Sequence, residues 1–176
     1  MDTESLLKSL NAHKVRYVII GATAFPVHGY ARATLAIDIF IEPTPQNARR
    51  TLAALQDVGY DVTDITVEDL LKKKLLIRQY ILETDIHPFV TGVTFEEVWR
   101  NRVKDKIGET PANFASLDDL IRMKQAAGRP KDLEDLRVLL KLKQRLKEWP
   151  YDTGLPDGNL GANPFDPKFE ENLICL

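Results

Sequence analysis

Hydrophobic residues recur at two spacings along the chain, and these spacings predict alternating helices and strands. Leucines three and four positions apart predict an amphipathic helix over residues 3–13. The run 16–20 is rich in β-branched and aromatic residues, which is typical of a strand, and Gly21 ends it. A short helix is expected over 22–28, with Gly29 as its C-cap.

The segment 35–41 alternates strictly and predicts a strand with two different faces. Its isoleucines fall on one face, whereas Ala36, Asp38 and Phe40 fall on the other. The isoleucine face is expected to be buried, so the second face presents Asp38 from within an otherwise apolar strand.

Capping residues and glycine or proline breaks mark the later elements. Helices are predicted at 45–58, 66–73, 94–102, 116–127 and 132–146. Strand-like sequence covers residues 75–81 and 84–89, and it forms either a tight hairpin or one bent strand.

These elements together predict an α/β (α+β) fold, in which a small mixed sheet is flanked by helices. We expect a core over residues 1–115 and a C-terminal helical portion over 116–148 that packs on it. Residues 149–176 are rich in proline, glycine and acids, so an irregular acidic tail is expected there.

Composition narrows the class of protein. A chain of 176 residues with 44% hydrophobic residues can bury one core. A net charge of −2 argues against a dedicated nucleic-acid binder, although 117–147 is locally basic and is either a solvated face or an anion-binding one. Because the chain shows neither an apolar run of roughly 20 residues nor a basic leader, we expect no membrane span and a cytoplasmic location.

Two acids in strand-like segments are the first candidates for chemistry. Burying Asp38 unpaired among Ile and Phe costs several kcal/mol, so it needs a metal or a partner, and an ion pair with Arg32 is the alternative. Asp85 shares a strand face with Glu83 and His87. Acids on adjacent strands can meet at one cation, and Mg²⁺ prefers carboxylate and phosphate oxygens.

Gly21 is the third candidate, because glycine after a strand allows a backbone loop to approach phosphates closely. The alternative is an ordinary turn.

The candidate residues belong to an ordered series of motifs, in which Gly21-Ala22-Thr23-Ala24 is followed by Arg32-x-Thr34-x-Ala36-x-Asp38. This series resembles the signature of the polymerase-beta-like nucleotidyltransferases. That signature is Gly-Gly or Gly-Ser on a short helix, followed by Asp-x-Asp on the next strand. Thr84-Asp85-Ile86 resembles the third carboxylate strand, and 92–99 and 116–136 resemble the helices after it. The branch that it most resembles includes stand-alone bacterial proteins, among them toxins of type IV toxin–antitoxin pairs.

The resemblance implies a metal-dependent transfer of a nucleoside monophosphate from a nucleoside triphosphate. Asp38 and Asp85 would be two ligands of Mg²⁺ or Mn²⁺. The residues implied to contact the nucleotide are Gly21, Ala22, Thr23, Arg32, Lys124, Arg129 and Lys131. For the lysines and for Arg129, a solvated helix terminus is the alternative. The acceptor would be an RNA, a protein or a small molecule, and a cognate antitoxin is an implied partner by family analogy alone.

Ala36 departs from the signature, because it stands where the first Asp of Asp-x-Asp is expected. The resemblance implies two metal ions held by three carboxylates, so without a carboxylate at 36 one metal ion loses a ligand. Catalysis should then fall steeply, while the fold and some nucleotide binding survive. Ala36 is either an engineered inactivating change or the mark of a natural pseudoenzyme. The competing functions are a catalytically silent module that binds nucleotide or a partner, and a purely structural domain.

Overall fold

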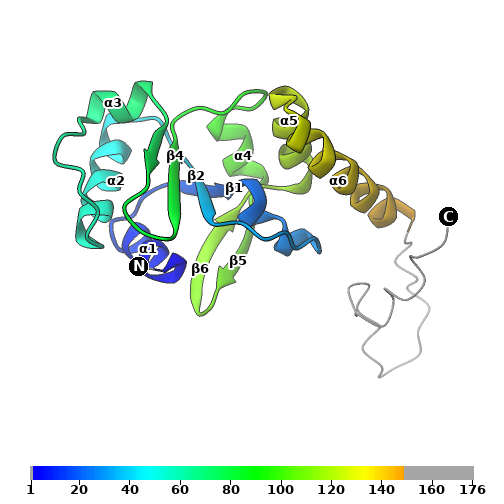
Figure 1. Ribbon diagram of the computed structural model, residues 1–176, viewed down its shortest axis with the longest axis horizontal. Coiled ribbons are helices and arrows are strands. Elements are labelled where there is room, and N and C mark those ends of the chain that lie inside the picture. Colours follow the sequence, from blue (N-terminus) through cyan, green and yellow to red (C-terminus); the bar gives the residue numbers. More distant parts are fainter. Residues whose placement is uncertain (1, 149–176) are drawn as a thin grey trace.

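The computed structural model describes residues 2–148, which contain one six-stranded mixed sheet in the order β3-β4-β2-β1-β6-β5 (Figure 1). The strands are β1 (Tyr17–Ile20), β2 (Ala36–Ile41), β3 (Leu75–Ile77), β4 (Glu83–His87), β5 (Val103–Ile107) and β6 (Thr110–Phe114). The α-helices are α1 (Thr3–Ala12), α2 (Pro45–Asp57), α3 (Val67–Lys72), α4 (Phe95–Asn101), α5 (Leu117–Ala127) and α6 (Pro130–Glu148). The predicted α+β class is confirmed, and the predicted tail lies outside the described residues.

Strand β2 lies near the middle of the sheet and carries the apolar core. It pairs antiparallel with β1 and parallel with β4. Ile37, Ile39 and Ile41 are fully buried, as the alternation predicts. Phe40 is buried as well, although it shares the face of Asp38, because Phe95 of α4 packs edge-on against it with ring centroids 5.3 Å apart. Helix α4 therefore covers one end of the face on which Asp38 lies.

The predicted caps hold the helices in place. Thr44 accepts a hydrogen bond from the backbone N–H of Asn47 at the start of α2. Thr66 and Thr94 begin α3 and α4 with complete capping boxes, as their sequences predict. Within residues 2–148, none of the helices combines the length and apolarity needed to cross a membrane.

Helices α5 and α6 pack against each other, and α6 runs out beyond the sheet (Figure 1). A buried charge network joins them: Lys124 Nζ lies 2.8 Å from Asp132 Oδ1 and 2.7 Å from Asp135 Oδ2. Buried charges remain tolerable only when they are paired in this way. The predicted boundaries at 115/116 and 148/149 stay predictions.

Two local expectations need correction. Residues 22–28 do not form one helix but two 3₁₀ turns, η1 (Gly21–Ala24) and η2 (Pro26–His28), because Pro26 begins a new turn rather than continuing the first. The strand predicted over 75–81 ends at Ile77, and β3 pairs antiparallel with β4, so the hairpin alternative is correct.

The hairpin of β5 and β6 was absent from the prediction. Strand β5 lies at the sheet edge with charged residues at 104–106, and β6 contains Pro111, so neither strand has the apolar character of a central strand. The available signal was the alternation of β6, in which Thr110, Ala112 and Phe114 are buried.

Candidate functional site

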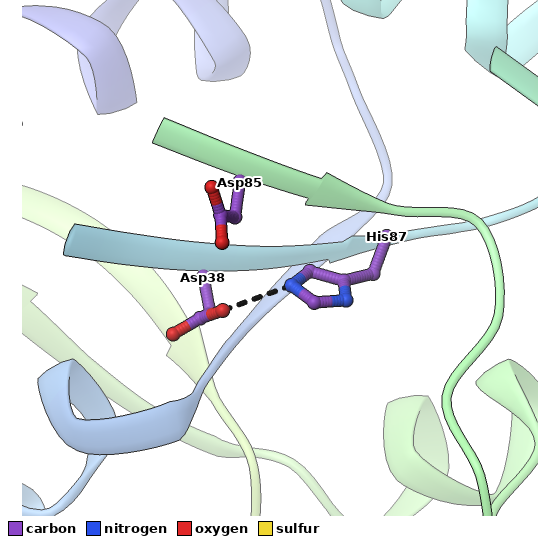
Figure 2. Close-up of side chains that lie close together, drawn as sticks. All are labelled: Asp38, Asp85 and His87. Carbon is purple, nitrogen blue, oxygen red and sulfur yellow. Dashed lines mark hydrogen bonds and ion pairs between the residues drawn. The ribbon is translucent and has the colours of Figure 1, made fainter. Parts of the chain in front are cut away.

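Asp38 and Asp85 lie side by side on the two central parallel strands (Figure 2). The strands β2 and β4 pair in register, so that the Cα atoms of Asp38 and Asp85 are direct partners and both side chains emerge on the same face. The Asp85 side chain is 9% exposed and that of Asp38 is 27% exposed. The two predicted metal ligands therefore lie next to each other, because β2 and β4 pair in this register.

His87 completes a three-residue group with these acids. It lies two positions after Asp85 on β4, and its Nε2 is 2.9 Å from Asp38 Oδ1 (Figure 2). One ligand atom from each of the three residues lies within 4.8 Å of the others. The sequence placed His87 on the face of Asp85 but gave no reason to assign it a role.

Two cations from the segment before β4 neutralise the acids. Lys74 Nζ lies 2.8 Å from Asp85 Oδ2 and 4.0 Å from Asp38 Oδ1. Arg78 Nη1 donates to Asp85 Oδ1 at 2.7 Å. Burial alone raises the pKa of Asp85, but the hydrogen bonds from Arg78 and Lys74 outweigh burial and hold the pKa below its usual value. Asp85 is therefore an anion at neutral pH, in a site that already attracts positive charge.

Gly21 brings the backbone of η1 into contact with Asp38. Its φ is +65°, and a Cβ atom added there would lie 2.4 Å from Asp38 Oδ2. Only glycine combines this left-handed conformation with so close an approach. Gly21 therefore lies against Asp38, while its contact with phosphate stays a prediction.

The other residues of the signature surround position 36. Ala22 is buried, and the Thr23 hydroxyl donates to the Ala36 carbonyl at 3.1 Å. Beside them is a pocket of about 370 Å³, and its lining includes Ala22, Thr23, Arg32, Thr34, Ala36 and Lys106. Ala36 thus places a methyl group on the strand face of Asp38, at the lining of this pocket.

The predicted basic residues occupy different environments. Arg32 Nε pairs with Asp135 at 3.2 Å, so the alternative ion pair between Arg32 and Asp38 is wrong. Lys124 is held in the buried network of α5 and α6, which the sequence did not reveal because its acids lie on the next helix.

Arg129 lies at the turn between α5 and α6. The hydrogen bond to Asp132 and, more weakly, the negative charge of Asp38 raise the pKa of Arg129. The turn is therefore within electrostatic range of the site. Lys131, two residues further on, is exposed.

A short glycine turn placed against in-register carboxylates on the central strands is the arrangement expected of a nucleotidyltransferase. A family model supports this class, since the family "nucleotidyltransferase of unknown function" (DUF6036) matches residues 2–144. The chain belongs to that family. No curated protein matches the sequence.

Proposed function

We propose that this protein transfers a nucleoside monophosphate from a nucleoside triphosphate to a hydroxyl group, with a divalent cation held by Asp38 and Asp85. The observation that carries the proposal is the in-register pairing of these acids beside the backbone of Gly21. The residues fit a cation, because two carboxylates converge on a point at which Lys74 already places a positive charge. Family membership supports transferase chemistry of this class.

Each proposed role follows from position. Asp38 and Asp85 bind Mg²⁺ or Mn²⁺, which supplies charge neutralisation for the phosphates. The backbone of Gly21, Ala22 and Thr23 lies against the phosphates, since η1 contacts Asp38. The acceptor hydroxyl bonds to the α-phosphorus and releases its proton, while the bond to the leaving pyrophosphate breaks.

The basic residues divide into two proposed groups. Arg129 and Lys131 are proposed to neutralise the triphosphate, because Arg129 lies at the turn between α5 and α6 and Lys131 is exposed at the start of α6. Arg32 lines the pocket beside Ala36 and can meet nucleotide or acceptor there. Lys124 has two carboxylate partners, so it serves the nucleotide through the position of the α5–α6 turn.

Ala36 is proposed to lower activity without removing the site. Glu83, which is the register partner of Ala36 on β4, pairs with Arg78 Nε at 3.3 Å and is therefore already engaged. A single preorganised electrostatic group is commonly worth about 10²–10³ in rate, and we expect a loss of that order from a missing carboxylate.

A silent binding module is the second candidate. Lys74 and Arg78 both bind Asp85, so cations of the chain itself neutralise the acids. With Ala36 in place of a third carboxylate, the site has less negative charge left for a metal ion. Such a site would hold a nucleotide or a partner without turnover. The acceptor in the first case, whether RNA, protein or small molecule, and a cognate antitoxin follow by family analogy only.

The test compares this chain with its Ala36→Asp variant. Binding of ATP, CTP, GTP and UTP with Mg²⁺ is measured by calorimetry, and transfer of labelled nucleotide is measured on total RNA and protein. We expect both proteins to bind and the variant to transfer at least about 100 times faster. Asp85→Asn in the variant is the control and should abolish transfer. Binding without transfer by either protein supports the silent module, and no binding to either refutes both the transferase and a module that holds nucleotide.

A further inference from the structure

We infer that His87 is a third protein ligand of the cation, so that the site takes a divalent transition ion such as Mn²⁺ in preference to Mg²⁺. The inference rests on the cation of the proposed function. It adds the ligand set and the class of metal, which neither the family nor the acids define.

The separation of the atoms fits a shared ion. Protein ligands lie about 2.0–2.2 Å from a small divalent cation, so two ligands at right angles are about 3 Å apart. His87 Nε2 and Asp38 Oδ1 are 2.9 Å apart, so both reach one ion with little movement. Ligands on opposite sides of such an ion are about 4.2 Å apart. The outer limit of 4.8 Å for the whole group therefore requires adjustments of less than 1 Å.

The sheet fixes the direction from which His87 reaches the ion. Asp85 and His87 are two positions apart on β4, so both side chains leave the same face. The register pairs His87 with Phe40, and the imidazole is 14% exposed. His87 thus approaches Asp38 from the side opposite Ala36. In this ligand set, the imidazole nitrogen of His87 on β4 takes the place of the carboxylate that is absent at position 36 on β2.

The hydrogen bond to Asp38 and a bond to the metal ion use the same imidazole nitrogen of His87. The position of the Lys74 ammonium determines which of the two forms. Without an added cation, His87 Nε2 is hydrogen-bonded to Asp38 Oδ1, while the Lys74 ammonium lies between the carboxylates. The Lys74 side chain is 39% exposed, and its flexible stem can turn to solvent. Its departure leaves two carboxylates and one imidazole facing the ion, while Arg78 stays bonded to Asp85.

The donor atoms select the ion. Mg²⁺ keeps oxygen ligands and dehydrates reluctantly, whereas imidazole suits transition ions. Among the divalent transition ions, Mn²⁺ is the one that carboxylates also suit, and it is paramagnetic, so it is the suitable probe for a site of two carboxylates and one imidazole.

Pulsed electron paramagnetic resonance of the full chain loaded with Mn²⁺ tests the inference directly. We expect nitrogen hyperfine coupling from one imidazole, and Mn²⁺ binding at least tenfold tighter than Mg²⁺ by calorimetry. His87→Asn should remove the coupling and weaken Mn²⁺ binding at least tenfold, since even partners outside the ligand shell are worth about 10–100-fold in affinity. His13→Asn is the matched control, because His13 also pairs with a single acid, Asp57 of α2, and lies at the C-cap of α1 rather than in the site. It should change neither readout.

Each contrary result has a distinct meaning. Tight Mn²⁺ binding without nitrogen coupling in the unmodified chain overturns the role of His87 and leaves the carboxylate site of the proposed function intact. Coupling that survives in His87→Asn also overturns it. Absence of any divalent binding overturns both this inference and the metal-dependent transfer. Because the first measurement uses the unmodified chain, the result does not depend on whether a variant folds.

Discussion

Replacement of Gly21 by alanine should displace the Asp38 carboxylate. An alanine there must adopt the φ of +65° and put its Cβ 2.4 Å from Asp38 Oδ2. Contacts of this kind begin near 3.4 Å, so the Asp38 carboxylate must move by about 1 Å. That movement changes the position of the Asp38 carboxylate relative to both His87 and Asp85.

The cost of the backbone can be worked out separately. A left-handed conformation costs a non-glycine residue roughly 1–2 kcal/mol. Alanine also reduces the conformational freedom of the unfolded chain, which offsets about 0.4–1 kcal/mol of this cost. We therefore expect a net loss near 1 kcal/mol in the free energy of unfolding from the backbone alone, together with a further cost from the displaced carboxylate.

Gly128→Ala is the matched control, because Gly128 has a φ of +62° and its added Cβ would have 3.9 Å to the nearest atom. Both variants are compared by urea unfolding and by calorimetric titration of Mn²⁺ and Mg²⁺. We expect similar backbone losses, but a drop in metal affinity of at least tenfold only for Gly21→Ala. Equal metal affinity in the two variants would falsify the view that the approach of Gly21 positions Asp38.

Two further predictions concern charged groups. Lys74→Met should strengthen Mn²⁺ binding, because it removes the ammonium from between the carboxylates. Lys73→Met loses only a surface pair with Asp69 and should leave the affinity unchanged. Unchanged affinity in both variants would show that Lys74 does not compete with the metal ion. Burial raises the pKa of Asp132, but Arg129 and Lys124 outweigh it and bring the pKa to about 2. This stabilisation is present above the unfolded pKa of about 4 and is lost as the pH falls toward 2. Over this pH range the free energy of unfolding of the unmodified protein should fall by about 2 kcal/mol more than that of Asp132→Asn. Urea unfolding at several pH values measures this, and parallel profiles for the two proteins would contradict it.

The parts of the fold that sequence could predict are those governed by local rules. Strand alternation places Asp38 opposite the isoleucines and Asp85 together with His87, and the structure confirms both. Capping boxes fix the starts of α3 and α4. These features need only neighbouring residues, so the printed sequence contains them.

The remaining features depend on which segments meet in space. The parallel pairing of β2 with β4, which turns two isolated acids into a site, is set by packing of the elements between them. Lys74 and Arg78 acquire their role only through that pairing. Lys124 has the sequence context of a solvated helix residue, and its burial follows from the acids that α6 brings over it.

Asp38 and His87 are 49 positions apart in the chain, so the site exists only after the helices and the hairpin between their strands have folded. The unfolded chain cannot bring these groups together, and an ion that needs all of them binds the native state alone. Such an ion at 100 times its dissociation constant adds about 2.7 kcal/mol to the free energy of unfolding. Metal supply would therefore set how long the protein survives proteolysis, and abundance of the folded chain would follow the concentration of the ion.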